Sequence, residues 1–508
     1  MRCSGCKTDI MYMGKTKKRP VDPSVKKAKI KRSKKIGFTL ATIQLILTCI
    51  FTGLVVYLNV LPNKILIPIL CVLLFVCLWD YLSQHSKKVR TAGKTIAVVF
   101  SLLLGIASYY LFVTNHVIDA ITGSNIKIDD VSIIVLEENA AQTIQDTKDY
   151  DFGILKNIDN TNTQKALSCV ETDVDAAVST KEYEDINTLV DALYKKKVGA
   201  IVLNEAYRES LKETHDNFDV DTRVLKTYTF RTKIATTSSN VKVTKEPFSL
   251  YITGIDTYGD ISKTSRSDVN IIATINPKTK QILLVSTPRD YYVELSVASG
   301  AYDKLTHAGT FGTDVSIKTL ENLYDLNIDY YARINFSGFE KMIDALGGVT
   351  VYNEEAFTSI DGYYIEGGNV TLDGTNALAF ARERHAFANG DNQRGINQMK
   401  VIRSIIDKVT SPSLLKNYTS ILDSMTGTVE TTLSSSDLSS LVKMQLDDNA
   451  DWNVVSYNVT GTGDKRYTYS YSSKALYVMI PDEDSIAGAK KLQQDVLDGK
   501  TISAPDAQ

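Results

Sequence analysis

Three long apolar segments near the start of this 508-residue chain constrain its architecture more than any other feature. Residues 36–58 contain no charged side chain, residues 65–82 contain a single Asp near their end, and residues 96–113 form a third apolar run. Each segment is close to the length that crosses a bilayer as a helix, about 20 residues. Buried core helices would show a polar face, which these segments lack. The sequence therefore predicts three transmembrane helices within residues 36–114.

Charge is distributed unevenly along the chain. Residues 1–35 carry 13 Lys or Arg and 2 Asp, whereas residues 115–508 carry 39 basic and 56 acidic side chains. A second basic cluster, residues 87–94, lies between the second and third spans. Because basic loops stay in the cytoplasm, we expect a basic cytoplasmic tail over residues 1–35 and an extracellular region after residue 115. The tail is too short for a helix-turn-helix, and lipid contact explains its charge better than a nucleic-acid partner does.

The six cysteines predict neither a disulfide framework nor a zinc domain. Three of them lie in the predicted spans, and Cys169 is alone in the extracellular part. Cys3 and Cys6 form a single CxxC pair without the further ligands that a zinc knuckle needs.

Two domains are predicted outside the membrane. Residues 115–235 combine strand-like segments at 131–136 and 198–203 with an amphipathic helix at 188–197 and a mostly helical stretch at 161–184. This mixture favours a small α/β accessory domain without a catalytic motif. A polar connector over residues 231–246 leads to the second domain.

The second domain is predicted over residues 247–481, with residues 482–508 as a C-terminal tail that contains one amphipathic helical stretch before a polar end. Its pattern alternates strands and helices, which favours a sheet covered by helices on both faces, an α-β-α sandwich. The expected strands are 250–255, 269–275, 281–286, 329–335, 349–353 and 452–457, and the expected helices are 316–324, 338–346, 374–381 and 392–409.

Charged residues gather at the ends of these predicted elements. One cluster contains Asp256, Arg266, Asp268, Arg289 and Asp290. Carboxylates together with several arginines suggest a divalent cation and a phosphate or pyrophosphate, because the guanidinium fork matches phosphate oxygens and the cation bridges them to carboxylates. The ordinary alternatives are strand-end caps for the two acids and a surface ion pair between Arg289 and Asp290.

A second cluster follows about a hundred residues later. Arg382 and Arg384 alternate, so they would share a face in an extended segment, although a solvated helix end also explains them. Asp391, Arg394 and Gln398 recur at helical spacing and form one polar stripe, for which exposure to solvent is the ordinary explanation. Arginines at three separate places in one acidic domain, namely 289, 382–384 and 394, nevertheless favour phosphate binding.

Several common catalytic motifs are absent from the sequence. It contains no GxSxG, GxxxxGK[ST], HExxH or GxGxxG motif. Only His307 and His385 fall in the second domain, and His385 beside Arg384 is better explained as a peripheral residue than as a base. A Ser-His-Asp hydrolase is therefore disfavoured.

Seven segments of the second domain occur in an order that is recognisable: GIDTYG, SRSDVN, LLVSTPRD, KLTHAG, INFSGFEKMIDALGGV, LDGTNALAFARERH and DNQRGINQMKVI. With these segments, the domain resembles the LytR-CpsA-Psr family of cell-envelope transferases. The three spans followed by an extra domain resemble the capsule-associated branch of that family. One departure is Ile396, where family members often carry another basic residue.

The resemblance implies an α-β-α fold that holds a polyprenyl-pyrophosphate-linked glycan, with the lipid in an apolar tunnel. It implies Mg²⁺, or Mn²⁺, held by Asp256 and Asp268, and a catalytic role for Arg289, Arg382, Arg384 and Asp391. Asp391 would orient Arg394 or act as the base. The residues implied to grip the pyrophosphate are Arg266, Arg289, Lys304, Arg382, Arg384, Arg394 and Gln398.

The resulting hypothesis is a multi-pass membrane enzyme on the outer face of a Gram-positive cell. It would transfer a glycopolymer to peptidoglycan, and the expected polymer is capsular polysaccharide. A pyrophosphatase side activity and capsule assembly proteins as further partners are also expected. Phe336–Leu346 and Leu378–Phe380 are expected either to line the lipid tunnel or to be plain core. The rival hypothesis is a non-catalytic regulator that binds the lipid carrier or the polysaccharide.

Overall fold

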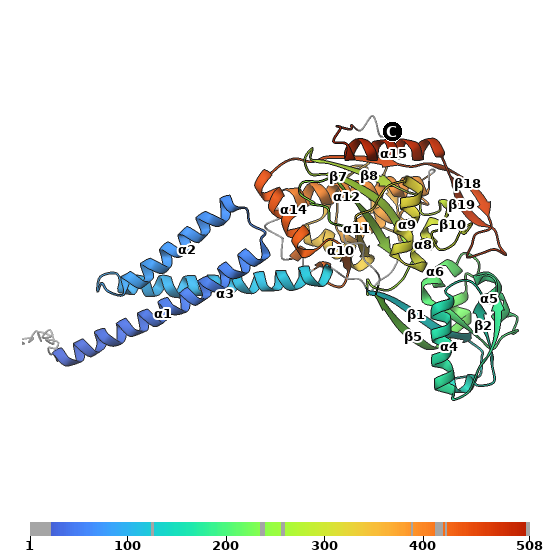
Figure 1. Cartoon of the computed structure of the whole chain (residues 1–508), viewed down its shortest axis with the longest axis horizontal. Coiled ribbons are helices and arrows are strands. Elements are labelled where there is room, and N and C mark those ends of the chain that lie inside the picture. The colour runs from blue at the N-terminus through green and yellow to red at the C-terminus, as the bar shows by residue number, and fades with distance from the viewer. Residues whose placement is uncertain are drawn as a thin grey trace, which may run out of the picture. The chain divides into compact units, whose positions relative to one another are not determined.

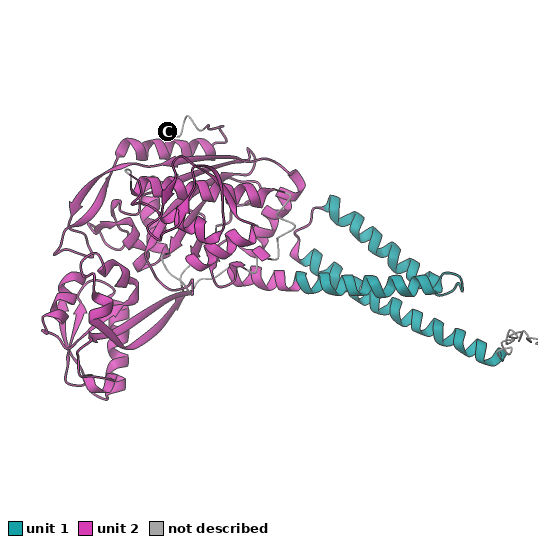
Figure 2. Cartoon of the chain, turned by 180° about the vertical axis from the view of Figure 1, so that it is seen from behind, with its two compact units in different colours: residues 1–57, 63–111 teal, residues 58–62, 112–508 magenta. Residues whose placement is uncertain are grey.

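The structure is a computed structural model that describes residues 22–122, 126–233, 239–255, 260–387, 390–411, 420–421 and 424–503. It divides into two compact units (Figure 2). The first comprises residues 1–57 and 63–111, and the second comprises residues 58–62 and 112–508. Asp256 and the Cys3–Cys6 pair lie outside the described residues.

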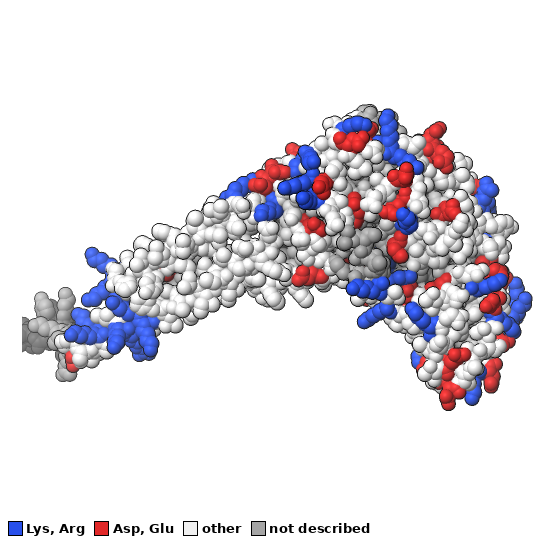
Figure 3. All heavy atoms as spheres, viewed as in Figure 1, with Lys and Arg blue, Asp and Glu red and all other residues white. Residues whose placement is uncertain are grey.

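The first unit is built from three long helices, α1 (Pro23–Leu58), α2 (Asn63–Ser83) and α3 (Arg90–Ile121). All three are long and apolar enough to cross a membrane, and they contain the three predicted spans. Figure 3 shows that Lys and Arg gather at one end of this helical part, whereas the surface between its ends is almost without charge. The helix α1 ends where Asn59 adopts a left-handed conformation, with a φ of 50°.

The accessory domain forms a five-stranded sheet in the order β3-β2-β4-β1-β5. Its helices α4 (Asn160–Val174) and α5 (Ile186–Tyr194) pack against separate apolar clusters of this sheet. The helical prediction for residues 161–184 holds only for α4, because residues 179–183 form β3, a polar edge strand parallel to β2. Edge strands carry no apolar alternation when both faces are exposed, so periodicity does not reveal them. The strands are β1 (Ile126–Leu136), β2 (Asp151–Leu155), β3 (Ser179–Tyr183), β4 (Ala200–Asn204) and β5 (Thr222–Lys233).

The central sheet of the second domain has six strands in the order β16-β11-β6-β7-β8-β17. The strands β6, β7 and β8 are antiparallel neighbours, while β11 and β17 run parallel to β6 and β8. The turn between β7 and β8 is closed by Asn276, whose side chain accepts hydrogen bonds from the backbone of Lys278 and Thr279. The strand bounds are β6 (Phe248–Ile255), β7 (Ser267–Asn276), β8 (Gln281–Ser286), β11 (Tyr330–Asn335), β16 (Val429–Thr431) and β17 (Asn453–Asn458).

Helices cover both faces of this sheet, so the predicted α-β-α architecture is confirmed (Figure 1). Alternate residues of β7 separate the two cores: Ile272 packs with the helices of one face, and Ile271 and Ala273 pack with those of the other. One face carries α8 (Leu305–Phe311), α9 (Thr313–Tyr324) and α15 (Glu483–Leu497). The other carries α10 (Phe336–Ala345), α11 (Gly374–Arg382) and α12 (Asp391–Thr410), and α14 (Ser435–Asp448) lies beyond β16 in the chain.

Two predicted segments differ from the structure in their role. The residues after 482 were expected to form a tail outside the domain. Instead, the apolar stripe of α15, which includes Ile486, Leu492 and Val496, is buried in the main core. The strand β12 (Val349–Asn353) forms where predicted, yet it pairs with β15 (Gly368–Leu372) in a separate small sheet. Further two-stranded sheets are β9–β10 (Tyr292–Glu294, Tyr302–Lys304), β13–β14 (Phe357–Thr358, Tyr364–Ile365) and β18–β19 (Gly461–Arg466, Leu476–Pro481).

Candidate functional site

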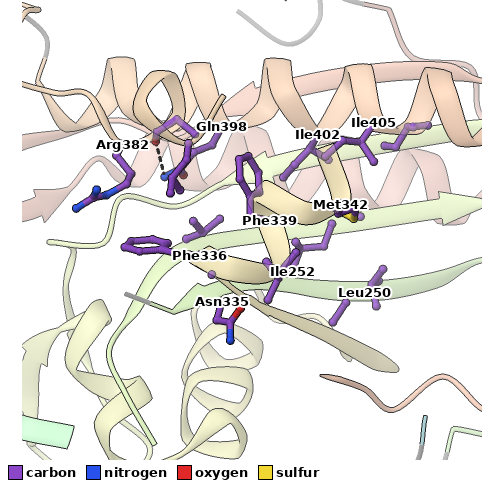
Figure 4. Close-up of a pocket in the computed structure, with 18 of the residues that line it drawn as sticks. Leu250, Ile252, Asn335, Phe336, Phe339, Met342, Arg382, Gln398, Ile402 and Ile405 are labelled. Atoms are coloured by element: carbon purple, nitrogen blue, oxygen red, sulfur yellow. Dashed lines mark hydrogen bonds between the residues drawn. The ribbon is translucent and has the colours of Figure 1, made fainter. Parts of the chain in front are cut away.

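An apolar cavity of about 310 Å³ lies between the central sheet and the helices α10 to α12 (Figure 4). Phe336, Phe339 and Met342 of α10 line it, as does Leu378 of α11. Of the residues expected to line a tunnel or to be plain core, these line the cavity, whereas Phe380 is fully buried in a neighbouring core cluster. The strands and α12 complete the lining with Leu250, Ile252, Val269, Ala273, Ile275, Ile282, Ala332, Ile334, Ile402, Ile405 and Ile406.

A polar pocket of about 520 Å³ adjoins this apolar cavity. The two share Gly254, Val269, Phe336, Arg382 and Gln398 in their walls. The strand-to-helix turn that carries Phe336 is fixed by the side chain of Asn335, which caps α10 by accepting from Gly338 N at 2.8 Å. The pocket brings together the following residues that the sequence singled out: Arg266, Asp268, Arg289, Lys304, Arg382, Arg384, Arg394 and Gln398.

Asp268 and Arg289 form a largely buried ion pair in this pocket. Arg289 Nη1 donates to Asp268 Oδ2 at 2.9 Å, and Thr306 Oγ1 donates to Asp268 Oδ1 at 2.9 Å. The β6–β7 register shifts so that Gly254 pairs with Val269 but the next residue pairs with Ser267, which leaves Asp268 in a β-bulge. Bulges re-aim a side chain out of the regular pleat, and this one directs the carboxylate towards Arg289.

The charges around Asp268 determine its protonation. Burial alone would raise the pKa of Asp268, but the Arg289 and Arg266 guanidinium groups outweigh it and hold the pKa below its ordinary value. Burial likewise opposes ionisation of Asp290, and Arg289 with Lys304 again lowers the pKa. Arg289 is closer to Asp268 than to Asp290, whose Oδ2 is 3.9 Å from Arg289 Nε, and neither ion pair is exposed at the surface.

The stripe on α12 faces the protein interior. Arg394 and Gln398 are buried, and Arg394 Nη2 is paired with Asp391 Oδ1. Gln398 Nε2 donates to Ala381 O at 3.2 Å, which ties α12 to α11. Burial raises the pKa of Asp391, and repulsion from Asp290 adds to this against the opposing charge of Arg394. The solvent-exposed alternative for this stripe is therefore wrong, whereas Ile396 packs into the apolar cluster on the same helix.

Arg382 and Arg384 reach the pocket from the end of α11. The residue between them, Glu383, adopts an extended conformation, so the chain leaves the helix there. Its buried carboxylate accepts hydrogen bonds from the backbone N–H of Arg384, His385 and Ile360, which fixes the turn. Arg382 lies over the Phe336 ring at 4.6 Å and donates to Asp361 at 3.2 Å. Glu383 was not predicted as a site residue, although its position between two arginines was a usable signal.

Lys304 is held by two acids, one of them from the accessory domain. Its Nζ donates to Glu213 Oε2 at 2.6 Å and is 3.4 Å from Asp290 Oδ1. Sequence reasoning missed this contact because Glu213 lies 91 residues upstream and carries no motif. The other lining residues that were not assigned a role in the site are Glu209, Lys212, Asp290, Ile360 and Tyr477, together with His385, expected to be peripheral.

The predicted metal site is only partly within the described residues, because Asp256 lies outside them. No group of three or more His, Cys, Asp or Glu side chains suited to a metal occurs among the residues that the structure describes. The donor set around Asp268 nevertheless fits Mg²⁺ or Mn²⁺ chemically, since it consists of hard oxygens: an ionised carboxylate and the Thr306 hydroxyl beside it.

Comparison with known proteins finds relatives by sequence, by structure and by family model. The TagU protein of Enterococcus faecalis, named a polyisoprenyl-teichoic acid–peptidoglycan teichoic acid transferase, is 39% identical over 231 residues, which are 45% of this chain and 74% of that protein. A TagU protein of Bacillus cereus with the same name is 41% identical over 200 residues, 39% of this chain and 65% of that protein. The crystal structure of B. subtilis TagV is 29% identical, with a TM-score of 0.42 over 51% of this chain and 99% of that chain. The family model LytR_cpsA_psr matches residues 203–493, and this chain belongs to the LytR_cpsA_psr family.

Proposed function

We propose that this protein is a membrane-anchored phosphotransferase that moves a glycopolymer from a polyprenyl-pyrophosphate carrier to peptidoglycan. The relatives named as teichoic acid transferases support the reaction class. We further propose capsular polysaccharide as the polymer, capsule assembly proteins as partners, and an extracellular position for residues 115–508. The three helices, followed by an accessory domain, support this choice because they resemble the capsule-associated branch.

The observation that carries the proposal is the junction of the two cavities. A polyprenyl pyrophosphate is a long apolar chain attached to a compact polyanion, and such a ligand needs an apolar cavity that opens directly onto basic side chains. Phe336, Arg382 and Gln398 line both spaces, so the apolar cavity leads directly into the arginine cluster. Apolar burial supplies affinity at about 0.8 kcal/mol per methylene, and the arginines supply charge recognition.

The residues of the polar pocket have separate roles in this reaction. Arg289, Arg382, Arg384 and Arg394 neutralise charge on the pyrophosphate oxygens, and Gln398 fixes the junction with the lipid. A peptidoglycan hydroxyl oxygen forms a bond to the glycan-linked phosphorus, the phosphorus–oxygen bond to the lipid phosphate breaks, and polyprenyl phosphate leaves with that electron pair. Asp391 does not itself line the pocket but is paired with Arg394, which does; its pKa is raised by burial, and it takes up the hydroxyl proton or else orients Arg394.

We propose Asp268 and Asp256 as the residues that hold Mg²⁺, or Mn²⁺ in its place. These two carboxylates would hold the ion, and the ion would supply positive charge that offsets the charge on the leaving phosphate. Water attack in place of the acceptor would give the pyrophosphatase side activity.

The test uses the full chain in lipid nanodiscs with a polyprenyl-pyrophosphate-linked glycan, peptidoglycan oligomers, and Mg²⁺ present or chelated. We expect metal-dependent release of polyprenyl monophosphate with the glycan attached to the acceptor, and loss of this product in Asp268→Asn. Asp407→Asn provides the matched control, because Asp407 is exposed on α12. Binding of the carrier without any turnover in the wild type would favour the rival regulator instead.

A further inference from the structure

A segment of the accessory domain forms one wall of the polar pocket. Glu209 of the short helix α6 (Arg208–Leu211) and the following Lys212 and Glu213 line the pocket. Glu213 Oε2 accepts from Lys304 Nζ, and Glu213 Oε1 is 4.0 Å from Arg266 Nη1. The proposed site is therefore assembled from both domains of the second unit.

This wall is held in place by residues of the second domain that are buried in the core of the accessory domain. Tyr471, from the chain between β18 and β19, is fully buried in the apolar cluster of the accessory domain together with Leu211. Its hydroxyl lies 3.1 Å from Ser210 Oγ on α6. The neighbouring Ser470 accepts from Ile186 N and donates its own N–H to the buried Asp303 beside Lys304. The segment that carries Glu213 is thus locked to the strand that carries Lys304.

The wall belongs to the polar pocket and takes no part in lining the apolar cavity. Glu209, Lys212 and Glu213 line the polar pocket but are absent from the lining of the apolar cavity. Tyr477 of β19 likewise lines the polar pocket and not the apolar cavity. Its half-exposed side chain packs across Gly463 of the paired strand. With the lipid in the apolar cavity and the pyrophosphate among the arginines, the group that meets this wall is the one attached beyond the second phosphate, a sugar.

The chemistry of the wall suits a sugar better than a phosphate. A carboxylate repels phosphate oxygens but accepts hydrogen bonds from hydroxyl groups, and a tyrosine ring offers an apolar face with a polar edge. Polar groups placed in this way supply orientation and specificity in small-molecule sites. Because Glu213 offsets the charges of Lys304 and Arg266, it also reduces the attraction of the pocket for a pyrophosphate that carries no sugar.

We propose that Glu213, together with Tyr477, forms a subsite for the first sugar of the lipid-linked donor and makes the pocket prefer a sugar-bearing pyrophosphate over a bare one. This inference rests on the proposed function, since it assigns the donor's sugar to the same pocket. The accessory domain then takes part directly in substrate selection.

The experiment measures dissociation constants of the full chain in nanodiscs for two probes: polyprenyl pyrophosphate, and the same lipid carrying one N-acetylglucosamine. We expect Glu213→Gln to weaken binding of the sugar-bearing lipid about tenfold, the loss of one hydrogen-bonded charged group, while the bare lipid binds as well as before or more tightly. Tyr477→Leu should also lower the preference for the sugar-bearing lipid. Glu182→Gln, on the exposed edge strand β3, is the matched control.

The outcomes separate this subsite from the transferase proposal. An unchanged preference in folded Glu213→Gln and Tyr477→Leu, or equal weakening of both lipids, would show that the wall is only structural. Rescue of the preference by Glu213→Asp would support a direct contact. A wild type that discriminates between the two lipids but transfers no glycan would refute the transferase and leave the subsite standing.

Discussion

The two adjoining cavities of this protein are built on opposite principles. The apolar cavity is lined by side chains that alternate along β6, β7 and β11 and recur at helical spacing on α12, so a periodic pattern within each element builds it. The polar pocket is lined by charges that come from strand ends, helix ends and the accessory domain. Its acidic groups hold basic ones in place, as Asp268 holds Arg289 and Glu213 holds Lys304.

This difference assigns distinct tasks to the two spaces. An apolar cavity discriminates weakly between ligands, since each methylene contributes only about 0.8 kcal/mol. Prearranged charges in a buried pocket act on developing charge and discriminate strongly. Dependence on lipid length should therefore reside in the apolar cavity, and dependence on the chemical step should reside in the polar pocket.

The largest effect is expected from Arg289→Ala. Removing this buried guanidinium takes away a charge that faces the pyrophosphate and leaves Asp268 without its closest partner. We expect kcat to fall about 10²- to 10³-fold, as for loss of one donor to a transition-state oxyanion. The decrease should be the same for short and long polyprenyl donors in steady-state assays.

The matched control for this variant is Arg403→Ala, because Arg403 is exposed on α12. A loss of activity in Arg289→Ala that grew with the length of the lipid would contradict the separation of tasks between the two cavities.

A smaller effect is expected from Ala332→Phe in the apolar cavity. Ala332 lies on β11 opposite Ile252, and both line this space, so a phenyl ring would occupy volume meant for the lipid. We expect the Michaelis constant for a long polyprenyl donor to rise about tenfold, the equivalent of roughly two methylenes displaced, with kcat little changed. Assays with a geranyl donor should show no such rise. An equal rise with both donors would mean that the substitution disturbs the polar pocket.

The sequence predicts the main elements well where one periodic pattern dominates. The strand β8 occupies the residues predicted, 281–286, and α12 begins one residue before its predicted start, at Asp391. The pattern fails for β3, a mostly polar strand on an edge of its sheet. For α15 it indicates the helix but not its place in the core, which depends on strands about 200 residues upstream. A periodic pattern therefore predicts the type of an element but not the element against which it packs.

The same limit applies to the site. Arginines and carboxylates in recurrent clusters indicated a phosphate pocket, and the structure brings Arg266, Asp268, Arg289 and Arg394 together. The sequence did not show that the α12 stripe faces inward, because helical spacing fixes a common face but not its direction. It also did not show Glu213 or Tyr477, since their roles arise from how the accessory domain and the β18–β19 hairpin meet the pocket.

The smallest expected effect is a difference in acid stability within the polar pocket. The folded pKa of Asp268 is lowered, despite its burial, by Arg289 and Arg266, whereas an unfolded Asp titrates near about 3.9. Such a group contributes stability that is present above the unfolded pKa and is lost as the pH falls through the folded pKa. Asp268→Asn should thus lower the apparent melting temperature at pH 7 by about 5 °C. The difference in melting temperature between this variant and the wild type should narrow only below about pH 4.

Asp391→Asn provides the comparison of opposite sign. Its folded pKa is raised by burial and by repulsion from Asp290, so its stabilising contribution is present below the unfolded pKa and is lost as the pH rises through the folded pKa. This variant should therefore gain stability relative to the wild type as the pH rises, whereas Asp268→Asn loses it. Thermal unfolding of the full chain in nanodiscs from pH 3 to pH 8 measures both. If the two variants shifted in the same direction, the arginines would not be distributing charge unequally between the two carboxylates, and the polar pocket would lack the prearranged charge that distinguishes it from the apolar cavity.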